Sequence, residues 1–152
     1  MLTVSLGATV LAEISAFVSL GGGLYETVVV NPYWPARPDI IQPGRGGINR
    51  KWFWIPAHVV FELSLLTALV AGWPELGLRN PLVIGFASHL RMRLWSAFDF
   101  IPKALAFERA APDVVDPKAA RRWTRRSNGR LVLDLITCGA MATGLLAAAR
   151  IG

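Results

Sequence analysis

The sequence is organised as four long apolar runs separated by polar connections. Each run reaches or approaches the ~20 residues that an α-helix needs to cross ~30 Å of hydrocarbon. The runs are too long and too continuous for the strands of a membrane barrel. The pattern predicts an all-α fold, a four-helix transmembrane bundle that forms a single membrane domain of residues 1–152, with spans at about 3–30, 52–73, 81–107 and 129–150.

The three connections differ in their content of basic residues. The second connection, 74–80, holds only Arg79, whereas the first, 31–51, and the third, 108–126, together hold most of the basic residues of the chain. Lys and Arg near the ends of spans accumulate on the cytoplasmic side of a membrane. We therefore expect the first and third connections to be cytoplasmic and both chain termini to be non-cytoplasmic.

A short basic interfacial helix is expected before the fourth span. Asp116 precedes Pro117, and this pair is typical of a helix start, because an acidic side chain caps the first turn and proline suits the first helical position. We predict that this helix continues into the fourth span. The cytoplasmic span ends are also flanked by aromatic residues, which predict an aromatic belt at the membrane interface: Tyr33, Trp34, Trp52, Trp54 and Trp123.

The composition also indicates an integral membrane protein. Hydrophobic residues make up 53% of the chain and charged residues 17%, against about 25% charged residues in a soluble domain. The net charge is +6 and most basic residues lie in the connections, so the expected partner is a bilayer with anionic head groups, and no nucleic acid is expected.

One cysteine, Cys138, excludes an internal disulfide. We expect an integral protein of the bacterial plasma membrane, with a first segment that is not a cleavable signal because it contains Glu13.

Ionisable residues are frequent within the predicted spans, although a charge inside a bilayer is costly and usually faces a partner or a wet cavity. At a rise of ~1.5 Å per residue, one group falls in the cytoplasmic half of the spans: Glu26, His58, Glu62, Asp99, Arg130 and Asp134. We expect a second group toward the outer half, made up of Glu13, His89, Arg91 and Arg93.

Helical spacing turns most of these groups toward one interior. His58 and Glu62 are four residues apart and share a helix face, and the same holds for Arg130 and Asp134. Glu13 points away from the polar face of its span. On the third span, one stripe at about 100° per residue contains His89, Arg93, Ser96, Phe100 and Lys103. We therefore expect a bundle with a polar, charge-balanced cavity that opens toward the cytoplasm.

Three interpretations of these groups are open. They form structural salt bridges, such as Arg130 with Asp134, or they line a pocket for a lipophilic substrate. In such a pocket His58 or Glu62 takes a proton, and an arginine stabilises the resulting oxyanion. A metal site is not favoured and no cofactor is expected, because the two Glu-x-x-His motifs of di-iron bundles are absent. The residues suited by type to bind a metal are Glu26, His58, Glu62, Asp99 and Asp134.

Three local patterns resemble a known family. The first span ends in GGGLYETVVVNPYWP, the third contains LWSAFDFIPKAL, and the fourth is preceded and opened by AARRWTRRSNGRLVLDL. In their order and spacing these patterns are similar to the anthrone-oxygenase-like family of small four-helix integral membrane proteins, whose bacterial members are mostly uncharacterised. The matching positions are Gly22, Gly23, Glu26, Pro32, Phe100, Ile101, Pro102, Trp123, Asn128 and Arg130.

The resemblance implies a membrane-embedded oxygenase, or a related enzyme, for a lipophilic, anthrone-like aromatic substrate. Characterised fungal relatives oxidise anthrones to anthraquinones in polyketide pathways without a conventional cofactor. By this resemblance His58 and Glu62 form the base, and Arg130 and Asn128 stabilise the oxyanion. The remaining pocket residues are then Glu26, His89, Arg93, Asp99, Phe100 and Asp134.

A non-catalytic membrane subunit or a small transporter is the alternative function. Its intramembrane charges would serve helix packing, partner binding or a proton path. Glu13, which lies off the main polar face, would then contact a second protomer in a homo-oligomer. An enzyme instead needs room beside His58 and Glu62 within a single chain, so the interior of the bundle discriminates between the two functions.

Overall fold

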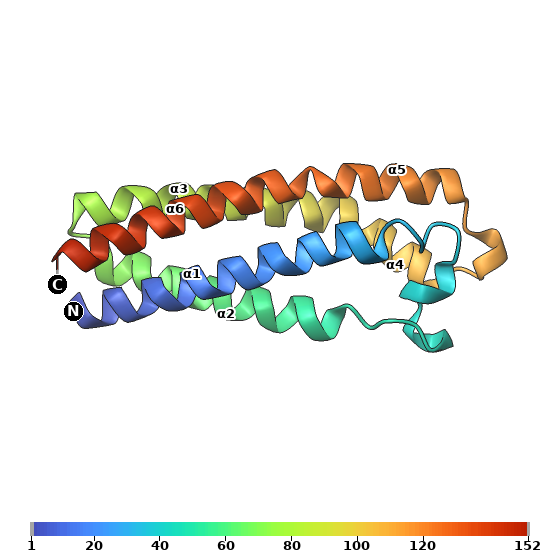
Figure 1. Cartoon of the computed structure of the whole chain (residues 1–152), viewed down its shortest axis with the longest axis horizontal. Coiled ribbons are helices and arrows are strands. Elements are labelled where there is room, and N and C mark those ends of the chain that lie inside the picture. Colours follow the sequence, from blue (N-terminus) through green and yellow to red (C-terminus); the bar gives the residue numbers. More distant parts are fainter. Residues whose placement is uncertain (1, 152) are drawn as a thin grey trace.

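The computed structural model describes residues 2–151, so Met1 and Gly152, the ends of the predicted 1–152 domain, lie outside the described residues. Within this range the chain is all-helical and contains no strand. Four helical rods run side by side along the long axis of the molecule, and the first rod begins at the end where the last one finishes (Figure 1). The all-α fold predicted from the apolar runs is confirmed for the described residues.

The four rods are built from six α-helices and two π-helices of the described chain. The first rod is α1 (Leu2–Tyr25) followed by the π-helix η1 (Glu26–Val30), and the second is α2 (Lys51–Gly72). The third joins α3 (Leu76–Trp95), the π-helix η4 (Ser96–Phe100) and α4 (Ile101–Arg109). The fourth joins α5 (Pro117–Asn128) to α6 (Arg130–Ile151).

Three helical stretches are long and apolar enough to cross a membrane, namely Thr3–Val30, Lys51–Gly72 and Pro117–Arg150. The third rod is not among them. It carries basic residues along its whole length, which lowers its hydropathy, even though it packs beside the other three.

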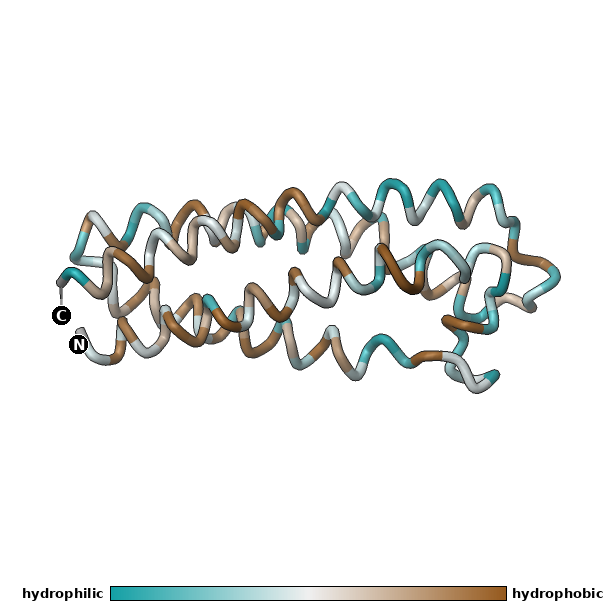
Figure 2. Tube along the Cα trace, in the orientation of Figure 1, coloured by the Kyte–Doolittle hydropathy of each residue, from teal (hydrophilic) through white to brown (hydrophobic). Residues whose placement is uncertain are grey.

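Apolar and small side chains fill the bundle from the chain ends toward its middle. Hydrophobic residues dominate this region, and hydrophilic residues gather at the opposite end (Figure 2). A glycine allows close packing of α3 on α6, because a Cβ atom at Gly85 would lie 2.3 Å from Cε of Met141. Helix α1 packs closely on α2 and α6, but α2 touches α3 far less. The core is formed by Ala12, Ala16, Leu20, Phe61, Leu65, Ala68, Leu82 and Met141, among others.

The two π-helices interrupt the first and third rods. In η1 the N–H of Asn31 donates to the carbonyl of Glu26 at 2.7 Å, and in η4 the N–H of Ile101 donates to the carbonyl of Ser96. A π-turn accommodates one more residue than an α-turn, so it shifts the rotational phase of the helix that follows. Such bulges are frequent at functional sites.

The first and third connections fold together into a cap at the end of the bundle away from the chain ends (Figure 1). The first contains the short 3-10 helices η2 (Pro38–Ile41) and η3 (Pro43–Arg45), and the third contains η5 (Pro112–Val114). The side-chain Nε2 of Gln42 donates to the carbonyl oxygens of Phe107 at 2.8 Å and Ala110 at 2.9 Å. These bonds satisfy carbonyls at the end of α4 and tie the two connections together.

A small aromatic core holds the cap. Trp34 is fully buried and Trp123 is 6% exposed, and their rings meet edge to face with centroids 5.8 Å apart. These two tryptophans therefore do not belong to the predicted aromatic belt, because the cap encloses them. Trp52 and Tyr33, at 81% and 64% exposed, have the exposure that the belt requires.

The predicted start of the basic helix is confirmed. The Asp116 side chain accepts a hydrogen bond from the backbone N–H of Lys118 at 2.8 Å, and Pro117 occupies the first helical position. Helix α5 then passes through Gly129, which keeps a right-handed helical conformation, into α6. The outer face of α5 carries the exposed side chains of Arg121, Arg122, Arg125 and Arg126.

Candidate functional site

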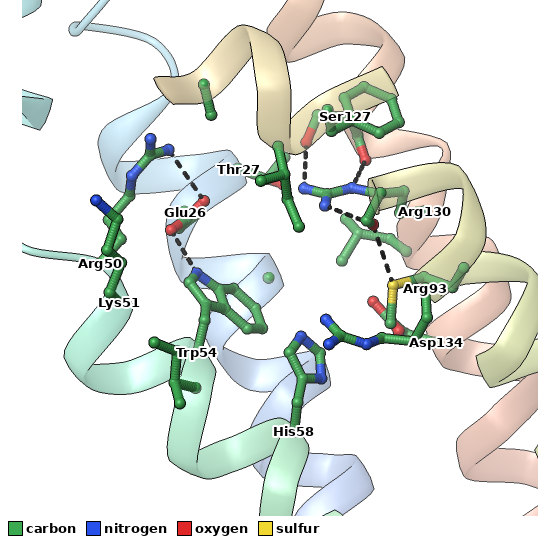
Figure 3. A pocket seen from close by; sticks show the side chains of 18 of the residues that line it. Glu26, Thr27, Arg50, Lys51, Trp54, His58, Arg93, Ser127, Arg130 and Asp134 are labelled. Carbon is green, nitrogen blue, oxygen red and sulfur yellow. Dashed lines mark hydrogen bonds and ion pairs between the residues drawn. The ribbon is translucent and has the colours of Figure 1, made fainter. Parts of the chain in front are cut away.

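A cavity of about 410 Å³ lies inside the bundle, next to the cap. It occupies the space that the loose contact between α2 and the third rod leaves open. All four rods contribute to its walls, and both π-helices do so through Glu26, Thr27, Ser96 and Phe100. Figure 3 shows polar side chains from η1, α2, α3, α5 and α6 converging on this space.

One wall of the cavity is a network around Glu26. The indole N–H of Trp54 donates to Oε1 of Glu26 at 2.8 Å, and Nη1 of Arg50 lies 3.9 Å from Oε2 of Glu26 (Figure 3). Arg50 also lies 3.5 Å from Glu108, which Lys51 contacts at 2.8 Å. The carboxylates on this side of the cavity are therefore neutralised by basic residues at the start of α2.

Arg130 forms the opposite wall. Its guanidinium donates to the hydroxyl of Ser127 at 2.7 Å and to that of Ser96 at 3.1 Å. It also lies over the Phe100 ring, 4.7 Å from the centroid. The salt bridge with Asp134, which was one of the interpretations left open by the sequence, is absent from the described residues. The two serine hydroxyls hold the guanidinium instead. Arg130 thus brings a positive charge into the cavity and forms no ion pair within residues 2–151.

Between these walls lie His58 and Glu62. The His58 ring stacks on Trp54 with centroids 5.4 Å apart and an angle of 22° between the rings. Its Nδ1 atom is buried and has no hydrogen-bond partner. A buried polar atom without a partner is uncommon and calls for an explanation, such as a bound ligand.

Glu62 does not pair with His58, although the two share a helix face. Its Oε1 atom lies 2.9 Å from Nε of Arg93 and 3.2 Å from Nε2 of His89. The expectation that His89 and Arg93 belong to a separate outer group is therefore wrong, because both reach Glu62 from α3. Arg93 lines the cavity, and His89 lies just behind it, 6% exposed.

Two other expected positions lie elsewhere. Asp99 forms ion pairs with Lys103 and Arg126 outside the cavity. Asn128 accepts a hydrogen bond from Thr27 at 3.3 Å and so links α5 to η1, one layer behind the cavity wall. The remaining expected pocket residues Glu26, Phe100 and Asp134 all line the cavity.

Glu13 is also placed differently from the expectation. It was expected to point away from the interior, yet its side chain is only 8% exposed and its Oε2 atom is buried without a partner. Helix α1 packs against both α2 and α6, so the buried arc of this helix is wide enough to include Glu13.

The sequence did not predict the contacts that several cavity residues make. Trp54 lies four residues before His58, and this spacing could have indicated a shared face. Arg50 and Glu108 lie next to a span end and reach the cavity only because the cap folds over it. No sequence signal marks Ser96 and Ser127 as the partners of Arg130.

Comparison with known proteins finds no matching family model, no matching curated relative and no matching solved structure. The chemistry of the cavity is therefore argued from its own geometry.

Proposed function

We propose that the chain spans a bacterial plasma membrane four times, with both termini on the non-cytoplasmic side. Three helices have the length and apolar character for crossing, and the third rod runs beside them over the same length (Figure 1). The two basic connections share one end of the bundle, which supports a common cytoplasmic location for them. The cavity then lies in the cytoplasmic half of the bilayer.

Cysteine labelling in intact cells tests this topology. Asn80 lies near the start of the third rod and Asp113 lies just beyond its end, in η5, and both are exposed. The native Cys138 is buried and can be replaced by serine. We expect Asn80→Cys to react with an impermeant maleimide in intact cells, and Asp113→Cys to react only after permeabilisation. Equal labelling of both positions would overturn the topology.

We further propose that the chain is a membrane-embedded oxygenase, or a related enzyme, for a lipophilic, anthrone-like aromatic substrate. The observation that carries this proposal is the cavity, whose walls hold both the Arg130 guanidinium and the His58 imidazole. Within the described residues, Arg130 has no ion-pair partner and the buried Nδ1 atom of His58 has no hydrogen-bond partner. A cation of this kind, held in a low-dielectric site, is positioned to stabilise an anion that forms during a reaction.

The volume and walls of the cavity suit a flat apolar molecule. About 410 Å³ falls in the range of about 300–1,000 Å³ that is usual for small-molecule sites. Trp54, Phe100 and Trp123 supply aromatic walls, and apolar side chains of α2 and α4 line the side between these two helices. A lipophilic substrate can bind here with its polar end toward Arg130.

The proposed reaction begins with removal of a proton from an acidic carbon of the substrate by His58. The electron pair left on that carbon is delocalised onto the substrate oxygen. Arg130 has N–H groups beyond those that it donates to Ser96 and Ser127, and these can stabilise the oxygen anion. Dioxygen then accepts four electrons from the carbon. One oxygen atom replaces the two hydrogens as a carbonyl and the other leaves as water, so no further reductant is needed.

Oxygen uptake by the detergent-purified protein tests the proposal. A simple hydroxylated anthrone serves as substrate, and a protein-free blank corrects for autoxidation. We expect uptake above the blank that is lost in His58→Ala and kept in Arg91→Ala, because Arg91 is exposed on the outside of the bundle. Uptake no faster than the blank would refute an anthrone oxygenase.

The alternative function, a non-catalytic subunit or small transporter, has one observation in its favour. Arg91 is exposed in the middle of the third rod, and an outward-facing charge at this depth needs a partner. If this function holds, cross-linking in native membranes will capture a homo-oligomer or a second protein through position 91, and the anthrone assay will show no uptake.

A further inference from the structure

Three metal-ligating side chains come together at the inner wall of the cavity. His58 and Glu62 on α2 and His89 on α3 each place one ligand atom within 4.8 Å of the others. The first two line the cavity, and His89 lies behind them. The grouping depends on the packing of α2 against α3, since only the His58–Glu62 pair is local in sequence.

We propose that His58, Glu62 and His89 bind one divalent transition-metal ion. Two imidazoles and one carboxylate suit Fe(II), Mn(II), Co(II) and Zn(II), whereas Mg²⁺ and Ca²⁺ prefer oxygen ligands alone. Three protein ligands leave coordination positions open, as in catalytic metal sites. Because His89 closes the rear of the site, the open positions face the cavity.

The distances fit a bound ion after a small movement. Ligand atoms that lie about 2.0–2.2 Å from one metal are separated from each other by about 2.8–3.6 Å, from octahedral to tetrahedral geometry. The 3.2 Å between Nε2 of His89 and Oε1 of Glu62 already has this value. The ring of His58 needs only a side-chain adjustment, since its ligand atom is at most 4.8 Å from the others.

Packing holds both rings in position. His58 stacks on Trp54, and His89 meets the ring of Phe61 edge to face with centroids 4.6 Å apart. Restricted rings lose little freedom when they bind a ligand, which favours binding. The buried Nδ1 atom of His58 shows that this imidazole is not committed to a structural hydrogen bond.

The positive charge of the Arg93 guanidinium repels a metal cation at this site. Its contact with Glu62 is to Oε1, and no ion pair or hydrogen bond to Oε2 occurs in the described part of the chain. A carboxylate that binds a metal is usually held by a second partner through a hydrogen bond. Arg93 can fill that role at Oε1 itself, because a carboxylate oxygen has two lone pairs and can bind the ion with one while it accepts from Arg93 with the other. The added positive charge then favours an anion, such as hydroxide or a deprotonated substrate, in the open positions.

The site also refines the proposed function, on which this part of the inference rests. A divalent cation held by His58, Glu62 and His89 would make a coordinated water acidic enough to supply a base for the substrate proton. His58 would then act as a ligand of the metal rather than as the base itself, and Arg130 would keep its place beside the substrate oxygen.

Cobalt binding by the full-length protein in detergent tests the site without any substrate. The protein is first freed of metal by chelation and then titrated with Co(II), followed by visible absorption and calorimetry. We expect one Co(II) per chain with the absorption bands of a protein-ligated ion, displaced by Zn(II). His58→Ala, Glu62→Gln and His89→Gln should each weaken binding by more than the about 10–100-fold that loss of an outer partner costs.

Asp134→Asn is the matched control, because Asp134 is also a carboxylate that lines the cavity but lies outside the cluster. Its affinity for Co(II) should equal that of the unchanged protein. The absence of Co(II) binding, or equal binding by the folded cluster variants, would overturn the metal site. Oxygen uptake separates the two proposals. Uptake by the chelated protein without Co(II) binding would retain the oxygenase and reject the metal site, whereas Co(II) binding without uptake by the Fe(II)-loaded protein would do the reverse. Uptake by the chelated protein together with Co(II) binding would reject the role of the metal in the reaction.

Discussion

Arg130 offers the most direct test of how the cavity works. Arg130→Met keeps an apolar stem of similar reach but removes the guanidinium that Ser96 and Ser127 hold at 3.1 and 2.7 Å. Side-chain hydrogen bonds inside membrane proteins contribute about 0.6 kcal/mol on average and at most about 1.7 kcal/mol. The loss of two such bonds therefore costs about 1–3 kcal/mol, which a folded bundle can tolerate.

The effect on turnover should be much larger than the effect on stability. Removal of one donor to a developing oxyanion lowers kcat by about 100–1,000-fold in other enzymes. We expect a loss of this size in Arg130→Met, and a smaller loss in Arg130→Lys. Lysine keeps the positive charge but lacks the planar fork that contacts both serines.

Oxygen uptake and thermal unfolding should be measured on the same preparations. Arg91→Met controls for the removal of an arginine at the outer surface of the same bundle. A properly folded Arg130→Met protein with full turnover would refute the role of Arg130 as oxyanion partner. A protein that loses activity and melting temperature in parallel would show that Arg130 acts only through packing.

Further predictions concern the cap and the Glu26 network. Gly47→Ala should lower the melting temperature, because a Cβ atom there would lie 2.1 Å from a backbone oxygen of η2. Gly44→Ala is the control and should leave the melting temperature unchanged, because nothing lies within 4 Å of its Cβ. Gln42→Leu removes two hydrogen bonds to carbonyls at the end of α4 and should cost about 1–3 kcal/mol in unfolding free energy; an unchanged melting temperature would contradict this. Trp54→Phe removes a donor to a carboxylate and should cost about 1.5–3 kcal/mol, while Trp52→Phe, at an 81% exposed position, should melt like the unchanged protein.

Local signals in the sequence predicted the helices well. The length of the apolar runs gave the four rods, and the Asp116–Pro117 pair gave the start of α5, because both depend on residues close together in the chain. The cavity was also predicted. The shared face of His58 and Glu62 follows from their four-residue spacing alone, so it does not depend on where the neighbouring helices lie.

The partners across helices could not be predicted in the same way. Glu62 contacts His89 and Arg93 because α2 and α3 are shifted along each other by one particular distance. The spacing of residues within each helix does not reveal that shift. The position of Lys103 was missed for another reason. It was assigned to the same stripe as His89, but η4 shifts the phase between them, and Lys103 is exposed and pairs with Asp99.

The π-helices have a consequence for how the protein can change over evolutionary time. A π-turn holds one extra residue within a single wider turn, so the helix that follows it faces almost the same way as it would after an ordinary α-turn. Deletion of one residue from η4 would therefore restore a continuous α-helix and leave the direction of α4 nearly unchanged. Deletion of one residue from the middle of α3, which is a regular α-helix, would instead turn the segments that follow by about 100° and separate the cap from the cavity. Changes of length in the third rod are thus tolerated at its π-turn and not in its α-helical parts.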